Sequence, residues 1–189
     1  MLKHFGAAAG IVLAVLMIAS CGAGNPGSQP GSVRTVDGPG LTRPATAEGP
    51  YAVDRVVDGD TVRVVVDGES ARVRLIGIDA PETNHPRLPV QCFGYEATQH
   101  ARDLVGGKDV YLEYDPSQGR QDRFGRELAY VWFDGDRMLN YEMIRDGFGH
   151  EYTYSAPYRY RDLFTQAQHE SAASDRGLWH ADTCAGVVE

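Results

Sequence analysis

Three short stretches of the chain combine acidic and basic side chains in a pattern that suits phosphate chemistry. They are residues 57–61 (Val-Asp-Gly-Asp-Thr), 74–83 (Arg-Leu-Ile-Gly-Ile-Asp-Ala-Pro-Glu-Thr) and 122–126 (Asp-Arg-Phe-Gly-Arg). Each one alone has an ordinary structural interpretation, as a turn, a strand end or a hairpin with solvated arginines. At the expected strand ends they place three carboxylates, Asp60, Asp79 and Glu82, and two guanidinium groups, Arg74 and Arg126, and we therefore treat them as one candidate site.

The carboxylates divide into metal ligands and a base. Asp60 and Asp79 are hard oxygen donors that suit Ca²⁺, and a backbone carbonyl beside Asp79 can provide a third ligand. Glu82 follows Asp79 by three residues and comes directly after a rigid proline. It can therefore lie near the metal without serving as a ligand, and it is then free to take a proton from an attacking water.

The arginines supply the positive charge that the reaction needs. Arg74 and Arg126 carry planar, permanently charged groups that match phosphate oxygens bidentately. Hydrolysis of a phosphodiester bond requires a water, a base, and cations where charge grows on the phosphorane oxygens. The chain shows no paired histidine spacing for zinc, no phosphate-binding glycine loop and no serine nucleophile motif. These residues predict a metal-assisted phosphodiesterase.

The formal net charge of −8 is unusual for a protein that acts on nucleic acid. Such proteins usually present a basic face, because neutralising phosphates releases counterions. The overall charge therefore argues mildly against a polynucleotide substrate. Any cationic surface must be local, and we expect a metal to supply the rest of the positive charge.

The elements that must position these residues are three strands, a helix, two strands and two helices, in that order. Two β-branched runs that flank Asp67-Gly68 indicate a hairpin, and Gly106-Gly107 ends the first helix. This order predicts an α+β protein, mainly β, with a small five-stranded Greek-key barrel and about three packed helices. Strands are expected at residues 53–57, 61–66, 71–78, 110–114 and 127–133, and helices at 94–105, 137–145 and 158–174.

Residues 1–20 are typical of an export signal peptide. Lys3 gives a short positive start, and residues 5–19 form an uncharged run that is too short to span a bilayer comfortably. The run ends in Ile-Ala-Ser-Cys, which resembles the bacterial lipobox, where the cysteine is lipidated. We therefore expect an exported protein held at the outer face of the cell membrane by a lipid on Cys21. The alternative is an ordinary cleaved signal with an incidental cysteine, and hence a secreted protein.

The remaining segments follow from composition and cysteine count. Residues 21–50 are expected to form a lipid-anchored flexible linker, because they are rich in small residues and proline and almost lack large apolar side chains. The folded domain is expected at 51–184, followed by a C-terminal tail at 185–189. Cys92 and Cys184 are expected to form a disulfide in an oxidising compartment, with two unpaired thiols as the alternative.

From about Tyr51 to Trp179 the chain resembles the staphylococcal nuclease (thermonuclease) family, with the three stretches in the same order and nearly without gaps. The resemblance implies an OB-fold barrel and a Ca²⁺-dependent nuclease, endo- or exonucleolytic, that acts on DNA and RNA and leaves 3′-phosphate ends. Tyr152 and Tyr154 match tyrosines of the nucleotide pocket, with core aromatics as their alternative. The residues carried over are the calcium ligands Asp60, Asp79 and Ala80 (through its carbonyl), the catalytic Arg74, Glu82 and Arg126, and the substrate-binding Arg123, Tyr152 and Tyr154.

Three positions depart from the family pattern. Ala80 replaces a threonine, Arg123 replaces a lysine, and Phe124 replaces a tyrosine and so lacks a hydroxyl near the phosphate. The strongly basic surface of the family's best-known member is also absent from this acidic chain.

A catalytically inactive barrel at the cell surface is the rival hypothesis, since OB-folds also bind oligonucleotides and other ligands without chemistry. That hypothesis predicts the loss of Arg74, Glu82 or Arg126, and none of the three is lost. We therefore favour an enzyme. We expect a monomer with no obligate protein partner.

Overall fold

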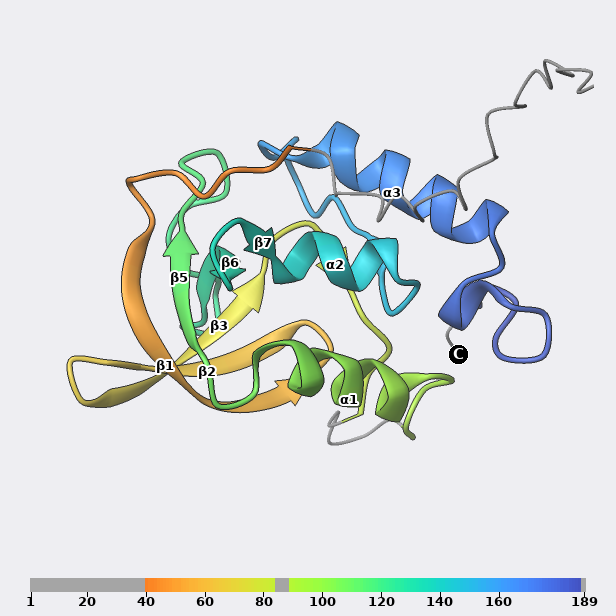
Figure 1. Ribbon diagram of the computed structural model, residues 1–189, viewed down its shortest axis with the longest axis horizontal. Helices are drawn as coiled ribbons and strands as arrows, with labels where there is room; N and C mark the ends of the chain where they lie inside the picture. The colour runs from red at the N-terminus through yellow and green to blue at the C-terminus, as the bar shows by residue number, and fades with distance from the viewer. Residues whose placement is uncertain (1–39, 84–88, 188–189) are drawn as a thin grey trace, which may run out of the picture. The chain divides into compact units, whose positions relative to one another are not determined.

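A computed structural model describes residues 40–83 and 89–187, and its centre is a closed barrel of five strands (Figure 1). Strand β1 pairs with β2, β2 with β3, β1 with β5, and β5 with β6, all antiparallel. A parallel pairing of β3 with β6 closes the ring, so the expected five-stranded OB-fold barrel is confirmed. The barrel strands are β1 (Glu48–Asp58), β2 (Thr61–Val66), β3 (Glu69–Leu75), β5 (Asp109–Glu113) and β6 (Glu127–Phe133).

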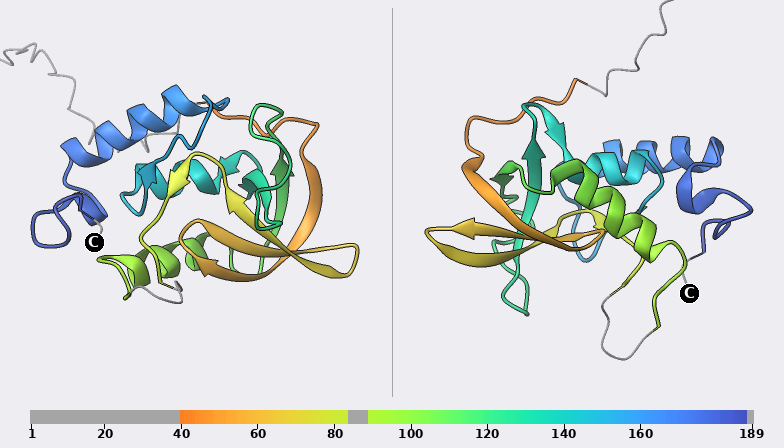
Figure 2. Two further views of the ribbon diagram at one scale, coloured as in Figure 1. Left: turned by 180° about the vertical axis from the view of Figure 1, so that it is seen from behind. Right: turned by 60° about the horizontal axis from the view of Figure 1, so that its bottom comes forward.

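Three helices pack on the barrel, as the sequence predicts. In Figures 1 and 2, α2 lies between α1 and α3, and α1 lies against β1. Three short strands complete the fold: β4 pairs with β8, and β7 pairs with β6. Their bounds are β4 (Ile78–Asp79), β7 (Arg137–Met138) and β8 (His150–Glu151), and those of the helices are α1 (Gly94–Val105), α2 (Leu139–Arg145), α3 (Arg161–Ala173) and the 3-10 turn η1 (Gly177–Trp179).

The hairpin of β2 and β3 forms where the sequence predicts it. Asp67 and Gly68 both have positive φ angles, 51° and 83°, which is the backbone that a tight two-residue hairpin requires. Along β2, Val62 and Val64 are fully buried, while Arg63 between them lies on the opposite face. The alternation of apolar and polar residues therefore sets one face of the hairpin into the core.

The predicted strand at residues 71–78 is divided in two. Strand β3 ends at Leu75, and the chain turns at Gly77, whose φ is 79°. A Cβ at this position would lie 2.5 Å from the ring of Tyr158, so only glycine fits. After the turn, Ile78 and Asp79 pair with β8 instead of continuing along the barrel. The turn is what directs Asp79 away from β3.

Residues 40–50 are part of the ordered domain, although the expected linker includes them. Leu41 and Ala47 pack against the core, and Glu48 begins β1, where it pairs with Leu112 of β5. These contacts join distant parts of the chain, so local composition does not reveal them. At the other end, the amide of Gly186 donates to the carbonyl of Leu178 at 2.9 Å, which places part of the expected tail on the domain.

The expected signal peptide, Cys21 and linker residues 21–39 lie outside the described residues. Within residues 40–83 and 89–187, no helix has both the length and the apolar character needed to cross a membrane.

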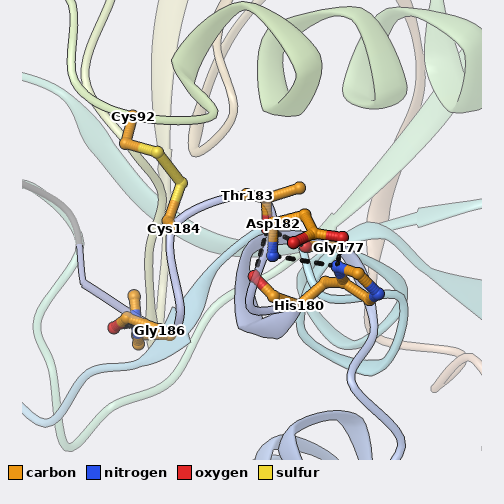
Figure 3. The surroundings of a disulfide bond; sticks show 8 residues. Cys92, Gly177, His180, Asp182, Thr183, Cys184 and Gly186 are labelled. Carbon is orange, nitrogen blue, oxygen red and sulfur yellow. Dashed lines mark hydrogen bonds and ion pairs between the residues drawn. A yellow bond between two sulfur atoms is a disulfide. The ribbon is translucent and has the colours of Figure 1, made fainter.

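The structure contains the expected disulfide between Cys92 and Cys184 (Figure 3). It joins the loop before α1 to the segment after η1, across a sequence separation of 92 residues. The same C-terminal segment is held by Thr183, whose hydroxyl donates to the carbonyls of Gly177 and His180 at 2.7 and 2.8 Å. The disulfide therefore fastens the end of the domain to the loop that precedes α1.

Replacing Cys184 with serine should lower the free energy of unfolding by roughly 4 kcal/mol, because closing so long a loop restricts the unfolded chain. Urea unfolding of the oxidised wild type and of Cys184→Ser measures the difference. Reduced wild type should resemble the variant, and reduction should not change the variant further. Equal midpoints for oxidised wild type and Cys184→Ser would show that the bridge contributes no stability.

Candidate functional site

A pocket of about 460 Å³ opens at one end of the barrel, where several elements meet. Its walls come from the end of β3, from β4, from the loop before β6 and from the segment after β8. Six of the residues predicted for the site line this pocket, although they come from widely separated parts of the chain. They are Arg74, Asp79, Arg123, Arg126, Tyr152 and Tyr154.

Strand pairing brings the two predicted catalytic arginines together. In the parallel ladder of β3 and β6, Arg74 lies opposite Leu128, and Arg126 precedes Leu128 by two residues. The guanidinium of Arg74 donates to the carbonyls of Leu75 and Ile78 at 3.0 and 2.6 Å. These two bonds hold one nitrogen of the Arg74 guanidinium against the backbone of the turn that follows β3.

Asp122 holds the second arginine in place. One carboxylate oxygen accepts from the Nε of Arg126 at 2.6 Å, and the other accepts from the amides of Phe124 and Arg126. Burial opposes the charge of Asp122, but these hydrogen bonds hold its pKa below the ordinary value. Asp122 lies in one of the three stretches, but the sequence predicts no role for it, since its bond to a guanidinium depends on the shape of the turn.

Asp60 is buried and makes contacts on both carboxylate oxygens. Thr61 donates its hydroxyl to one oxygen at 3.0 Å, and the amide of Ala80 donates to the other at 3.0 Å. The Nη2 of Arg74 lies 3.1 Å from Asp60 and 3.2 Å from Asp79. A Cβ on Gly59 would be 2.6 Å from that of Ala80, so this glycine allows the turn to approach. The structure therefore brings together the three predicted metal ligands.

Glu82 lies on the carboxylate side of the site and is not one of the residues lining the pocket. Its backbone amide donates to the side chain of Gln91 at 2.8 Å, and its carbonyl accepts from the Gln91 amide at 2.9 Å. Burial raises the pKa values of Asp58 and Asp79, and the negative charge of Glu82 adds a smaller contribution in the same direction. Gln91 was missed from the sequence, where nothing distinguishes it from any other polar loop residue.

The carboxylate cluster is short of positive charge. Burial, together with the charge of Asp60, raises the pKa of Asp58 to about 8. Partial burial and the charge of Asp60 also raise the pKa of Asp79, against the opposing effect of Arg74. Asp58 stands in the first motif, and its proximity to Asp60 was the signal that could have identified it. A cation at the cluster would relieve this repulsion.

The donor set fits a hard cation that takes part of its coordination from backbone and water. In the described part of the chain, no three His, Cys, Asp or Glu side chains are arranged so that they could hold a metal ion by themselves. Asp60 and Asp79 provide two carboxylates, and the Ala80 peptide lies beside Asp60. Such a mixture of carboxylate, carbonyl and water oxygens is typical of Ca²⁺ and leaves coordination positions open.

Exposed aromatic rings also line the pocket. Tyr152 is 43% exposed and Tyr154 is 72% exposed, so the core interpretation of these tyrosines is wrong. Their ring centroids lie 6.3 Å apart, and the amide of Tyr152 donates to the carbonyl of Gly77. Phe124 is also exposed, and the guanidinium of Arg123 lies 4.7 Å from the centre of its ring. These rings offer flat surfaces beside the guanidinium groups.

Fold and site together define an OB-fold domain with a pocket lined by guanidinium groups and exposed aromatic rings. Comparison with known proteins places the chain more closely, because residues 72–181 match the family described as Staphylococcal nuclease homologue. The thermonuclease of Staphylococcus intermedius is 41% identical over 129 residues, which cover 68% of this chain and 75% of that protein. The chain therefore belongs to the staphylococcal nuclease family.

Two further relatives show the same relationship. The thermonuclease of Staphylococcus hyicus is 39% identical over 129 residues, with the same coverage of 68% and 75%. Endonuclease YncB of Bacillus subtilis is 33% identical over 128 residues, which cover 67% of this chain and 60% of that protein.

Without divalent cations, the thermal stability of the protein should fall as the pH rises from about 4 towards about 8. In this window the folded protein keeps a proton on Asp58 that the unfolded chain has lost, since its pKa is raised from 3.8 to about 8. The folded state then binds more protons, so a rising pH favours unfolding. Asp58→Asn should make the decline shallower, because an amide does not titrate.

The midpoint of thermal unfolding is measured for the wild type and for Asp58→Asn, in a chelator, across this pH range. Asp103→Asn, on the exposed face of α1, is the matched control and should follow the wild type. If Asp58→Asn declines as steeply as the wild type, Asp58 is not the group that holds the proton.

Proposed function

We propose that this protein is a calcium-dependent nuclease that hydrolyses phosphodiester bonds of DNA and RNA and leaves 3′-phosphate ends. The observation that carries the proposal is the convergence of Arg74 and Arg126 on one pocket, beside a cluster of carboxylates. The names of the relatives, two thermonucleases and an endonuclease, support the same class of reaction.

The two arginines bind the phosphate and stabilise the charge that grows on its oxygens. Each guanidinium is already oriented by the protein, Arg74 by two backbone carbonyls and Arg126 by Asp122. Groups that are held in place before the reaction need little reorganisation in the transition state, and this makes their electrostatic contribution large. The contacts seen around both arginines therefore favour catalysis over simple binding.

Asp60, Asp79 and the Ala80 carbonyl would hold the calcium ion, which would polarise a phosphate oxygen and make a bound water more acidic. Glu82 takes a proton from the water while the oxygen of that water bonds to phosphorus. The bond between phosphorus and the 5′ oxygen breaks, and the departing oxygen takes a proton from solvent. The phosphate then remains on the 3′ side.

Tyr152, Tyr154 and Phe124 supply faces on which the bases next to the phosphate stack. Stacking on an aromatic side chain contributes about 1 to 3 kcal/mol per base and tolerates any base. It does not depend on the 2′-hydroxyl, which is the group that separates RNA from DNA. The exposed rings therefore support a nuclease that accepts both polymers.

Glu82→Gln should reduce turnover by about 10² to 10⁴, because the amide cannot accept the proton. Substrate affinity should change little, since the arginines hold the phosphate. Turnover and affinity are measured with labelled DNA and RNA, in Ca²⁺ and in excess chelator. Glu96→Gln, the same change on the exposed start of α1, is the control and should behave as the wild type.

The outcomes separate the alternatives. A catalytically inactive binding barrel would bind the substrates and cleave none of them, with or without Ca²⁺. Equal turnover by Glu82→Gln and wild type would mean that Glu82 is not the base. Full activity in excess chelator would contradict the metal requirement.

We further propose that the protein is exported and tethered to the outer face of the membrane through a lipid on Cys21. The apolar run that ends in Ile-Ala-Ser-Cys supports this assignment. Cys21→Ser should move the protein from the membrane fraction to the soluble or unprocessed pool. Wild-type protein that is fully soluble and carries no lipid mass would show that the domain is simply secreted.

A further inference from the structure

A row of arginines crosses the outer face of the barrel and ends beside the catalytic pocket. Arg55 of β1 lies directly opposite Arg63 of β2, and Arg63 lies directly opposite Arg72 of β3. Residues that face each other across an antiparallel ladder point to the same side of the sheet. Arg72, in turn, precedes Arg74 by two residues on β3 and so shares its face. We call Arg55, Arg63 and Arg72 the arginine ladder.

The ladder lies on solvent-facing surface. The neighbouring residues Val62, Val64 and Val73 point the other way and are fully buried. The β2–β3 hairpin projects from the barrel on the side away from the C-terminus, in both Figure 1 and Figure 2. Arg72 donates to the carbonyl of Phe124 at 3.4 Å, which joins the ladder to the loop that lines the pocket.

Among the described residues, no carboxylate forms a direct ion pair with the ladder. Across residues 40–83 and 89–187, none of its three arginines forms a salt bridge, although Arg137 and Arg145 both pair with Glu142. Arg63 instead donates to the hydroxyl of Ser70 at 3.1 Å, and this hydroxyl donates to Asp54 at 2.9 Å, so the carboxylate of Asp54 reaches the ladder only through Ser70. Like charges that face each other across strands destabilise a sheet. In a chain with 26 acidic residues, this arrangement indicates an anionic ligand.

The extent of the ladder suits a chain of phosphates. Neighbouring strands lie about 4.8 Å apart, so the three arginines cover about 10 Å across the sheet, and Arg74 lies about 7 Å further along β3. Successive phosphates of one strand advance by about 3.4 Å in duplex geometry. The ladder and Arg74 can therefore meet several phosphates of one strand. Acidic residues at the hairpin turn, Asp67 and Glu69, end the positive surface there.

We propose that the arginine ladder binds the backbone of the polynucleotide outside the cleavage site, so that the substrate strand runs from the pocket over Arg72 and Arg63 to Arg55. The proposal rests on the proposed nuclease function and extends it to the choice of substrate. Guanidinium forks match phosphate oxygens and do not depend on base sequence. If the ladder binds the backbone, the enzyme prefers polymers to dinucleotides. The ladder also gives this acidic protein a local binding site for a polyanion.

The test uses the double variant Arg55→Gln/Arg63→Gln, because both residues are remote from the pocket. Binding of a single-stranded oligonucleotide of about 20 nucleotides is followed by fluorescence anisotropy in chelator at several salt concentrations. Each lost phosphate contact should reduce the slope of log affinity against log salt by about 0.7, so the variant should lose about 1.4. At about 0.15 M salt this corresponds to roughly tenfold weaker binding.

Activity in Ca²⁺ gives the second measurement. KM for the oligonucleotide should rise, while kcat and KM for a dinucleotide, which is too short to reach the ladder, should not change. The control Arg102→Gln/Arg176→Gln removes two exposed arginines elsewhere and should behave as the wild type. Arg55→Lys/Arg63→Lys keeps the charges and should retain most of the salt slope. Circular dichroism checks that each variant is folded.

An unchanged salt slope and KM in Arg55→Gln/Arg63→Gln would overturn the proposal, as would an equal loss in the control variant. If the double Gln variant does not fold, the single variant Arg55→Gln replaces it: a slope lower by about 0.7 supports the ladder, and an unchanged slope overturns it. If wild type cleaves neither substrate, the nuclease function fails, whereas the anisotropy measurement still decides whether the ladder binds the strand.

Discussion

The parallel pairing of β3 with β6 is the contact on which the rest of this structure depends. Val73, Arg74 and Leu75 lie opposite Glu127, Leu128 and Ala129, across a gap of more than fifty residues in the sequence. The pairing closes the barrel and removes two strand edges that would otherwise remain open to other chains. It also places Arg74 and Arg126 at one end of the barrel, which neither strand accomplishes alone.

Asn140 stabilises the place where β3 and β6 close the barrel. The side chain is completely buried, and it donates to the carbonyls of Ile76 and Ala129 at 2.9 and 3.2 Å. Its oxygen accepts from the amide of Val131 at 2.9 Å. A buried polar group whose bonds are all made favours a single arrangement over its competitors. α2 therefore links the end of β3 to β6, just before Gly77 turns the chain towards the metal ligands.

The distribution of charge matters more here than its total. The formal net charge is −8, yet the pocket holds two guanidinium groups that the protein orients with its own carbonyls and carboxylates. Burial, together with the charge of Asp60, raises the pKa of Asp58 to about 8. Opposite charges thus lie side by side at one end of the barrel. The net charge therefore does not reveal that a cluster of carboxylates and a group of guanidinium groups lie next to each other.

The sequence by itself determined the local elements and the residue types of the site. Strands β2 and β6 and helix α1 have the predicted bounds, because alternation, helical spacing and the Asp67-Gly68 turn are signals carried by neighbouring residues. Only the tertiary structure decided that residues 40–50 belong to the domain, that Asp122 orients Arg126 and that Gln91 holds Glu82. These features depend on contacts formed only after the chain has folded, and local sequence patterns carry no signal for them.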